Sequence, residues 1–119
     1  MLFRSTIIRC GGLIGGERHP GKFLSGRTNL DGGNQPVNLI HLDDVVGFVK
    51  FVITQKLQQE VFNLVAPSHP SRRAYYQGFC QRRSLPLPEF TDSPVAGKTI
   101  SSKKVEKLYA FTAGTLEAP

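Results

Sequence analysis

Glycines cluster near the start of the chain, in the stretch RCGGLIGGERHPGKF at residues 9–23. They follow the apolar run at residues 6–8, and a strand that runs into glycines is where a loop for the phosphates of a dinucleotide is expected. Such a loop needs glycine at its first, third and sixth positions, but the third position counted from Gly11 is Leu13. The His-Pro-Gly at residues 19–21 would also break the helix that should hold the phosphates. We therefore expect no cofactor-binding residues here.

The tyrosines form no catalytic pair with lysine. In nucleotide-linked α/β reductases a lysine four residues after a tyrosine lowers the tyrosine pKa. Here the residues four positions after Tyr75, Tyr76 and Tyr109 are Phe79, Cys80 and Ala113. The nucleophile-elbow motif of the hydrolases is missing too. The sequence predicts no catalytic residue in this chain.

The histidines and cysteines do not have the spacing of a metal site. His19, His41 and His69 are isolated and each precedes a turn or a helix, which is typical of caps and loop contacts. Cys10 and Cys80 form neither a metal-ligand pair nor a redox pair. The start of the chain lacks the apolar core of a signal peptide. We expect a cytoplasmic protein with two free thiols and no metal.

The chain is basic, with a net charge of +6 and 119 residues, the size of one domain. Its basic residues are scattered in pairs such as Arg72-Arg73 and Arg82-Arg83, and no run is as long as a basic arm. This scatter favours a solvated surface over a nucleic-acid footprint. Anionic small molecules remain open as ligands.

Strand and helix patterns alternate along the chain. β-branched runs predict strands over residues 5–9, 37–41 and 60–67. Helices are predicted over residues 44–54, after Ser71 as N-cap, and after Ser101 or Ser102, with Asp43 or Asp44 as N-cap or first-turn acid of the first one. Shorter candidates are a helix at KFLSGRT and strands at LPEF and residues 98–100. This order is that of an α/β protein.

The predicted helix over residues 44–54 is apolar around most of its circumference. Such a helix should be buried on both flanks. A chain of this size has little material for that purpose, so the pattern indicates a piece of a larger α/β protein.

Four motifs carry a family resemblance in their order along residues 5–111: IIRCGGLIGGERHPGKF, VNLIHLDDVVGFVKFVI, EVFNLVAPSHPSR and KTISSKKVEKLYAF. They resemble the C-terminal portion of an extended short-chain dehydrogenase/reductase. More narrowly, they are similar to the nucleoside-diphosphate-sugar epimerase-like branch of the NAD-dependent epimerase/dehydratase family. The resemblance implies one domain, residues 1–119, with a partial Rossmann-type α/β fold. This fold contains the last strands and helices plus the substrate-binding lobe, and lacks the N-terminal cofactor-binding half.

The resemblance also implies site residues. Arg18 and Asn38 would face a nucleotide sugar, His19 and His41 would complete the substrate-binding set, and Asp44 would cap its helix. For Asn38, hydrogen bonding to loop backbone groups is an equal alternative. The family's Tyr-Gly-Pro is replaced by Ile-Gly-Gly at residues 14–16. That replacement removes a tyrosine contact and leaves the substrate undefined.

Two functions follow as hypotheses. The first is a truncated epimerase/dehydratase-like protein that binds a nucleotide sugar without turnover by itself. It has no cofactor in this chain, whereas full-length relatives use NAD or NADP, and its exposed sheet and helix face is covered by a second copy or another partner. The alternative is a stand-alone basic module for anionic ligands or nucleic acid, nucleic acid being the less expected ligand. Neither hypothesis involves a membrane.

Overall fold

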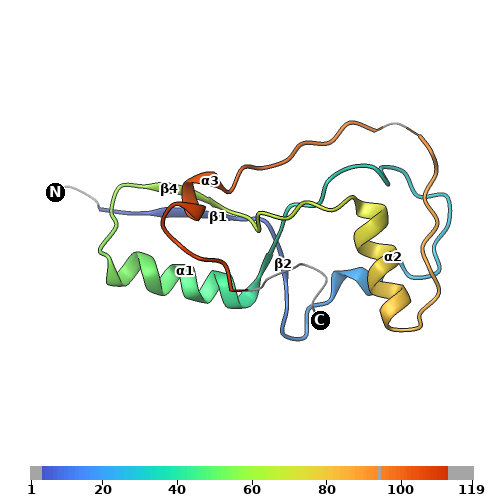
Figure 1. Cartoon of the computed structure of the whole chain (residues 1–119), viewed down its shortest axis with the longest axis horizontal. Coiled ribbons are helices and arrows are strands. Elements are labelled where there is room, and N and C mark those ends of the chain that lie inside the picture. Colours follow the sequence, from blue (N-terminus) through green and yellow to red (C-terminus); the bar gives the residue numbers. More distant parts are fainter. Residues whose placement is uncertain (1–3, 94, 113–119) are drawn as a thin grey trace.

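The computed structural model describes residues 4–93 and 95–112. The molecule is elongated, measuring 54 × 28 × 24 Å (Figure 1). Its radius of gyration is 16.3 Å, whereas a compact domain of this length has about 13.5 Å. The exposed area is 7612 Å² for 13.1 kDa, compared with about 6,400 Å² for a compact monomer. The chain thus carries more uncovered surface than a self-contained domain of its mass.

Most helices and strands gather in two groups at opposite ends of the long axis, and β2 with its partner β3 lies between them (Figure 1). At one end α1 lies along β1 and β4, with the short α3 beside β4; at the other end η1, a 3₁₀ helix, packs on α2. The elements in chain order are β1 (Ile7–Cys10), β2 (Gly12–Ile14), η1 (Pro20–Leu24), β3 (Leu39–His41), α1 (Leu42–Thr54), β4 (Val61–Leu64), α2 (Arg72–Arg82) and α3 (Lys103–Glu106).

The strands form two short parallel pairs. β1 pairs with β4, with Ile8 opposite Phe62, and β2 pairs with β3, with Leu13 opposite Ile40. Parallel strands occur almost only in α/β proteins whose helices cover the sheet. The predicted α/β class is therefore confirmed.

The main core lies between α1 and the β1–β4 pair. Phe48 and Val52 of α1 meet Phe62 and Leu64 of β4, and Val105 of α3 closes the cluster. The Phe48 and Phe62 rings meet edge to face with centroids 5.1 Å apart, a favoured aromatic geometry. A smaller cluster, consisting of Ile14, Val37, Ala66 and Tyr75, connects this end to α2.

Two expectations about α1 are wrong, whereas the alternative role predicted for Asp43 or Asp44, an acid in the first turn, is confirmed. His41, and not an aspartate, is the N-cap: its Nδ1 accepts a hydrogen bond of 3.0 Å from the backbone N–H of Asp43. Asp44 is instead buried inside the first turn. The second error concerns burial, because one flank of α1 leaves apolar side chains exposed. Those side chains stay partly exposed because, among the described residues, the two-stranded sheet covers only the opposite flank.

The predictions for the other elements are confirmed only in part. Ser71 caps α2, as predicted, by accepting a hydrogen bond of 3.1 Å from Ala74 N–H. β2 was not expected from the sequence, and of KFLSGRT only residues 22–24 are helical, as the end of the 3₁₀ helix η1. Residues 98–100 form no strand, and LPEF contributes only an isolated bridge between Leu30 and Phe90. Among the described residues, no helix has the length and apolarity to cross a bilayer.

Candidate functional site

The glycine cluster builds a tight turn at the carboxyl end of β2. Gly15 and Arg18 exchange two backbone hydrogen bonds of 3.0 Å, so Gly16 and Glu17 form a two-residue loop. The φ angles of Gly15 and Gly16 are +102° and +59°, in the region that favours glycine. The turn therefore explains the glycines by local geometry.

His41 lies directly against this turn. It pairs with Ile14 in the β2–β3 ladder, and a Cβ atom added to Gly15 would come within 2.7 Å of His41 Nε2. The imidazole is mostly buried, with 16% of its side chain exposed. Because Nδ1 accepts a hydrogen bond from Asp43 N–H, the proton of a neutral imidazole sits on Nε2, at the edge beside Gly15.

Arg18 joins His41 at the turn. Its Nε donates a hydrogen bond of 3.0 Å to the carbonyl of Leu13 on β2, and the residue is exposed. No described residue accepts a hydrogen bond from its terminal amino groups. A guanidinium held by one nitrogen keeps its fork of donors available for a phosphate or a carboxylate. The structure therefore brings two of the four expected residues, Arg18 and His41, to the same turn.

The other two expected residues lie elsewhere. His19 precedes η1 and faces Phe79 of α2, with ring centroids 6.0 Å apart. Asn38 uses both ends of its amide on the backbone: Nδ2 donates to Lys98 O at 2.9 Å and Oδ1 accepts from Ile100 N–H at 2.8 Å. Asn38 thus adopts the backbone-satisfying role that the sequence left open.

A buried carboxylate was missed by sequence reasoning. Asp44 is 1% exposed, and its Oδ1 accepts hydrogen bonds from Tyr109 Oη, Thr112 N and Thr112 Oγ1 at 3.0, 2.7 and 2.9 Å. Burial, and then the hydrogen bond to this carboxylate, raise the pKa of Tyr109. The sequence around Asp44 gives no signal of its contact with Tyr109, because Tyr109 lies 65 residues further along the chain.

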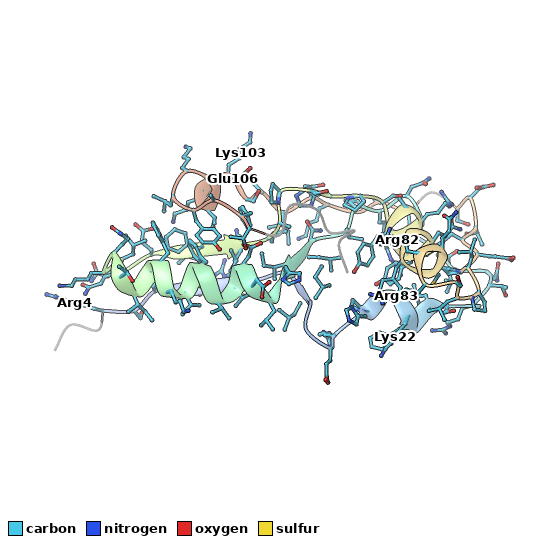
Figure 2. All side chains as sticks on the ribbon, turned by 60° about the horizontal axis from the view of Figure 1, so that its bottom comes forward. Arg4, Lys22, Arg82, Arg83, Lys103 and Glu106 are labelled. Atoms are coloured by element: carbon cyan, nitrogen blue, oxygen red, sulfur yellow. The ribbon has the colours of Figure 1, made fainter. Side chains whose placement is uncertain are left out.

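A basic patch lies at the far end of the molecule, where η1 meets α2 (Figure 2). Lys22 belongs to η1, while Arg82 and Arg83 end α2. The Arg83 guanidinium lies 4.5 Å from the centroid of the Phe79 ring. None of the described acidic residues forms an ion pair with these three side chains. The patch, defined as Lys22, Arg82 and Arg83, is a second candidate site for anions.

No metal centre is visible in residues 4–93 and 95–112, where no group of three His, Cys, Asp or Glu side chains could hold an ion. An open cavity of about 340 Å³ lies between the end of β4 and α3, lined by Pro67, His69, Thr99, Ser101, Ser102, Lys103 and Glu106. His69 Nδ1 bonds the carbonyl of Val37 at 2.9 Å, and Ser102 Oγ donates to Glu106 Oε2 at 2.8 Å. These polar groups thus support the fold around the cavity.

Known proteins share this architecture. The human epimerase family protein SDR39U1, solved with NADPH, superposes with a TM-score of 0.76 at 18% identity, over 96% of this chain and 46% of that one. This chain has the fold of part of an NAD-dependent epimerase/dehydratase. MoeE5, solved with UDP-glucose and NAD, matches with a TM-score of 0.64 at 17% identity, over 94% of this chain and 43% of that one. The resemblance stated from the sequence motifs, with its partial Rossmann-type fold, is confirmed at the level of the fold.

Sequence comparison adds curated relatives, the YeeZ proteins of two Escherichia coli strains. Protein YeeZ of Escherichia coli K12 is 38% identical over 92 residues, which make up 77% of this chain and 33% of YeeZ. The chain thus spans about a third of the length of this curated relative. No family model matches the sequence of this chain.

Proposed function

We propose that the chain is a nucleotide-sugar-binding lobe of an epimerase/dehydratase-like protein, without turnover by itself. The observation that supports this proposal is the meeting of Arg18 and His41 at the glycine turn. MoeE5, which shares the fold, was solved with UDP-glucose. In α/β proteins, ligands bind beyond the carboxyl ends of parallel strands, and this turn follows the carboxyl end of β2.

The chemistry of the turn suits a sugar diphosphate. The free amino groups of Arg18 match the paired oxygens of a phosphate. The Nε2–H of His41 offers a further donor beside Gly15, where the missing Cβ leaves the ring edge uncovered by a side chain. Binding is all that these groups provide, since the sequence has neither the glycine-rich cofactor loop nor the Tyr/Lys dyad. A cofactor and acid–base groups would have to come from outside these 119 residues.

Calorimetry tests this function. UDP-glucose titrated into the chain should give saturable binding, and Arg18→Gln should weaken it at least about tenfold, because charged hydrogen bonds to the phosphates are lost. Arg4→Gln is the matched control: it removes the same charge at one end of the long axis, before β1 and away from the glycine turn (Figure 2). Equal affinity of the Arg18 and Arg4 variants, or no saturable binding of the wild-type chain, would refute the proposal.

The alternative function is a basic binding module, and the basic patch favours it. Three cations that form no ion pair with a described acidic residue can attract a polyanion through long-range electrostatics. Binding of this kind falls steeply with salt concentration. The test is a titration with heparin or single-stranded DNA at several salt concentrations. The basic-module function is supported if Arg82→Gln and Arg83→Gln each reduce the slope of log affinity against log salt concentration.

The proposed lobe needs a covering partner, either a second copy or another polypeptide. The excess exposed area and the uncovered flank of α1 support this proposal.

A cytoplasmic location is proposed on the basis of the two free cysteines, Cys10 and Cys80. Fractionation of cells that express the tagged chain tests the location.

A further inference from the structure

An apolar stripe runs along the uncovered flank of α1. Leu42, Val46, Val49 and Ile53 are 38%, 45%, 38% and 70% exposed. Their spacing of four, three and four residues places them on one face of the helix, as in the seam of a helix pair. The opposite face of α1 packs on β4. The stripe is therefore additional to the face that holds the fold together.

Two opposite charges flank this stripe on one side. Asp43 and Lys50 are seven residues apart, so they lie two turns apart in the same row of the helix. Both are exposed, and no described side chain forms an ion pair with Lys50. In an antiparallel pair of identical helices, Asp43 of each copy lies beside Lys50 of the other copy, so the pair contains two such contacts. A parallel pair would instead place this row beside the other flank of the partner's stripe, so Asp43 and Lys50 of the two copies would not meet.

We propose that two copies of this chain pair through the stripe, with their α1 helices antiparallel about a two-fold axis near the middle of the helix. A two-fold contact needs a surface that complements itself, and the charge row beside the stripe meets this condition. A stable interface covers about 800 Å² per partner, and the chain exposes about 1,200 Å² more than a compact monomer of its mass. The inference specifies the proposed covering partner and does not depend on nucleotide-sugar binding.

Sedimentation velocity at protein concentrations from about 1 to about 100 µM tests the dimer. This range covers interfaces with micromolar dissociation constants. The wild-type chain should sediment at about twice 13.1 kDa, and Val49→Asp should remain monomeric. Val61→Asp is the matched control, because Val61 is 41% exposed on the outer face of the β1–β4 pair. It should leave the dimer intact. A wild-type monomer throughout, or dissociation by Val61→Asp and not by Val49→Asp, would overturn the proposal.

Charge exchange tests the antiparallel arrangement. Asp43→Lys alone and Lys50→Asp alone should each weaken the dimer about tenfold or more, because two attractive pairs become repulsive. An equimolar mixture of these two variants should restore pairing, since each lysine of one copy then meets an aspartate of the other. Misfolding of either variant cannot produce this restoration. Failure of the mixture to exceed the single variants would overturn the arrangement.

Discussion

Tyr109 Oη donates a hydrogen bond of 3.0 Å to Asp44 Oδ1, which joins the end of the described chain to the first turn of α1. Thr112 bonds the same oxygen through its backbone N–H and its hydroxyl. A buried carboxylate is costly unless it is hydrogen-bonded, and these donors satisfy one of its oxygens. The segment over residues 109–112 is therefore held by Asp44, which makes this pair the first target for stability measurements.

The first prediction concerns alkaline pH. Because burial and the Asp44 hydrogen bond raise the pKa of Tyr109, folding favours the neutral phenol. This stabilisation is complete below about pH 10, the ordinary tyrosine pKa, and is lost as the pH rises through the raised value. Urea unfolding should show wild type more stable than Tyr109→Phe by about 1–2 kcal/mol at neutral pH. The difference should shrink above pH 10, and a constant difference would contradict this account.

The second prediction concerns Gly47, whose missing Cβ makes room for Tyr109 Oη. Alanine is the better helix former by about 1 kcal/mol, so an open site would gain from the exchange. Here the added methyl group overlaps the hydroxyl, and Gly47→Ala should destabilise the chain by about 1–3 kcal/mol. The same exchange combined with Tyr109→Phe should cost much less in chemical denaturation. Additive effects of the two changes would contradict the overlap.

A third prediction separates core from surface. Phe48 is fully buried and Phe23 is 58% exposed. Phe48→Ala should lower the unfolding free energy by about 3–5 kcal/mol, or prevent folding. Phe23→Ala should change it by no more than about 0.5 kcal/mol. Thermal and urea unfolding, followed by circular dichroism, compare the unfolding free energies of the two variants. An equal loss of unfolding free energy in both would contradict the described core.

The fourth prediction uses the two glycines of the turn. Gly15→Ala should destabilise the chain by about 1–3 kcal/mol, since its positive φ is strained for alanine and its Cβ meets the His41 ring. Gly16→Asn should be nearly neutral, because asparagine tolerates a φ near +59° and only Leu42 lies within ordinary contact. Urea midpoints compare the two, and the reverse order would contradict the described turn.

Local patterns in the sequence predicted α1, α2 and the strands β1, β3 and β4 to within a few residues, because each has a strong period or a cap such as Ser71. β2 was missed since its three residues, Gly12–Ile14, include a glycine and are too short for a periodic signal. The strand expected at residues 98–100 does not form. Its backbone is instead bonded by the Asn38 side chain.

The candidate site was only partly predictable. Arg18 and His41 meet because the β2–β3 register places Ile14 opposite His41, and the sequence alone does not fix that register. The Asp44 network depends on a contact across 65 residues, which local patterns do not encode. The open flank of α1 was expected to be buried, since periodicity reveals an apolar face but not whether this chain supplies its cover.

The most direct test of the central claim is to follow the backbone amide resonances of the ¹⁵N-labelled chain by NMR while UDP-glucose is added. Binding at the turn predicts saturable shifts at Gly15, Gly16, Arg18 and His41, with the basic patch unchanged. Shifts confined to Lys22, Arg82 and Arg83, or no saturable shift at all, would contradict a nucleotide-sugar site at the glycine turn.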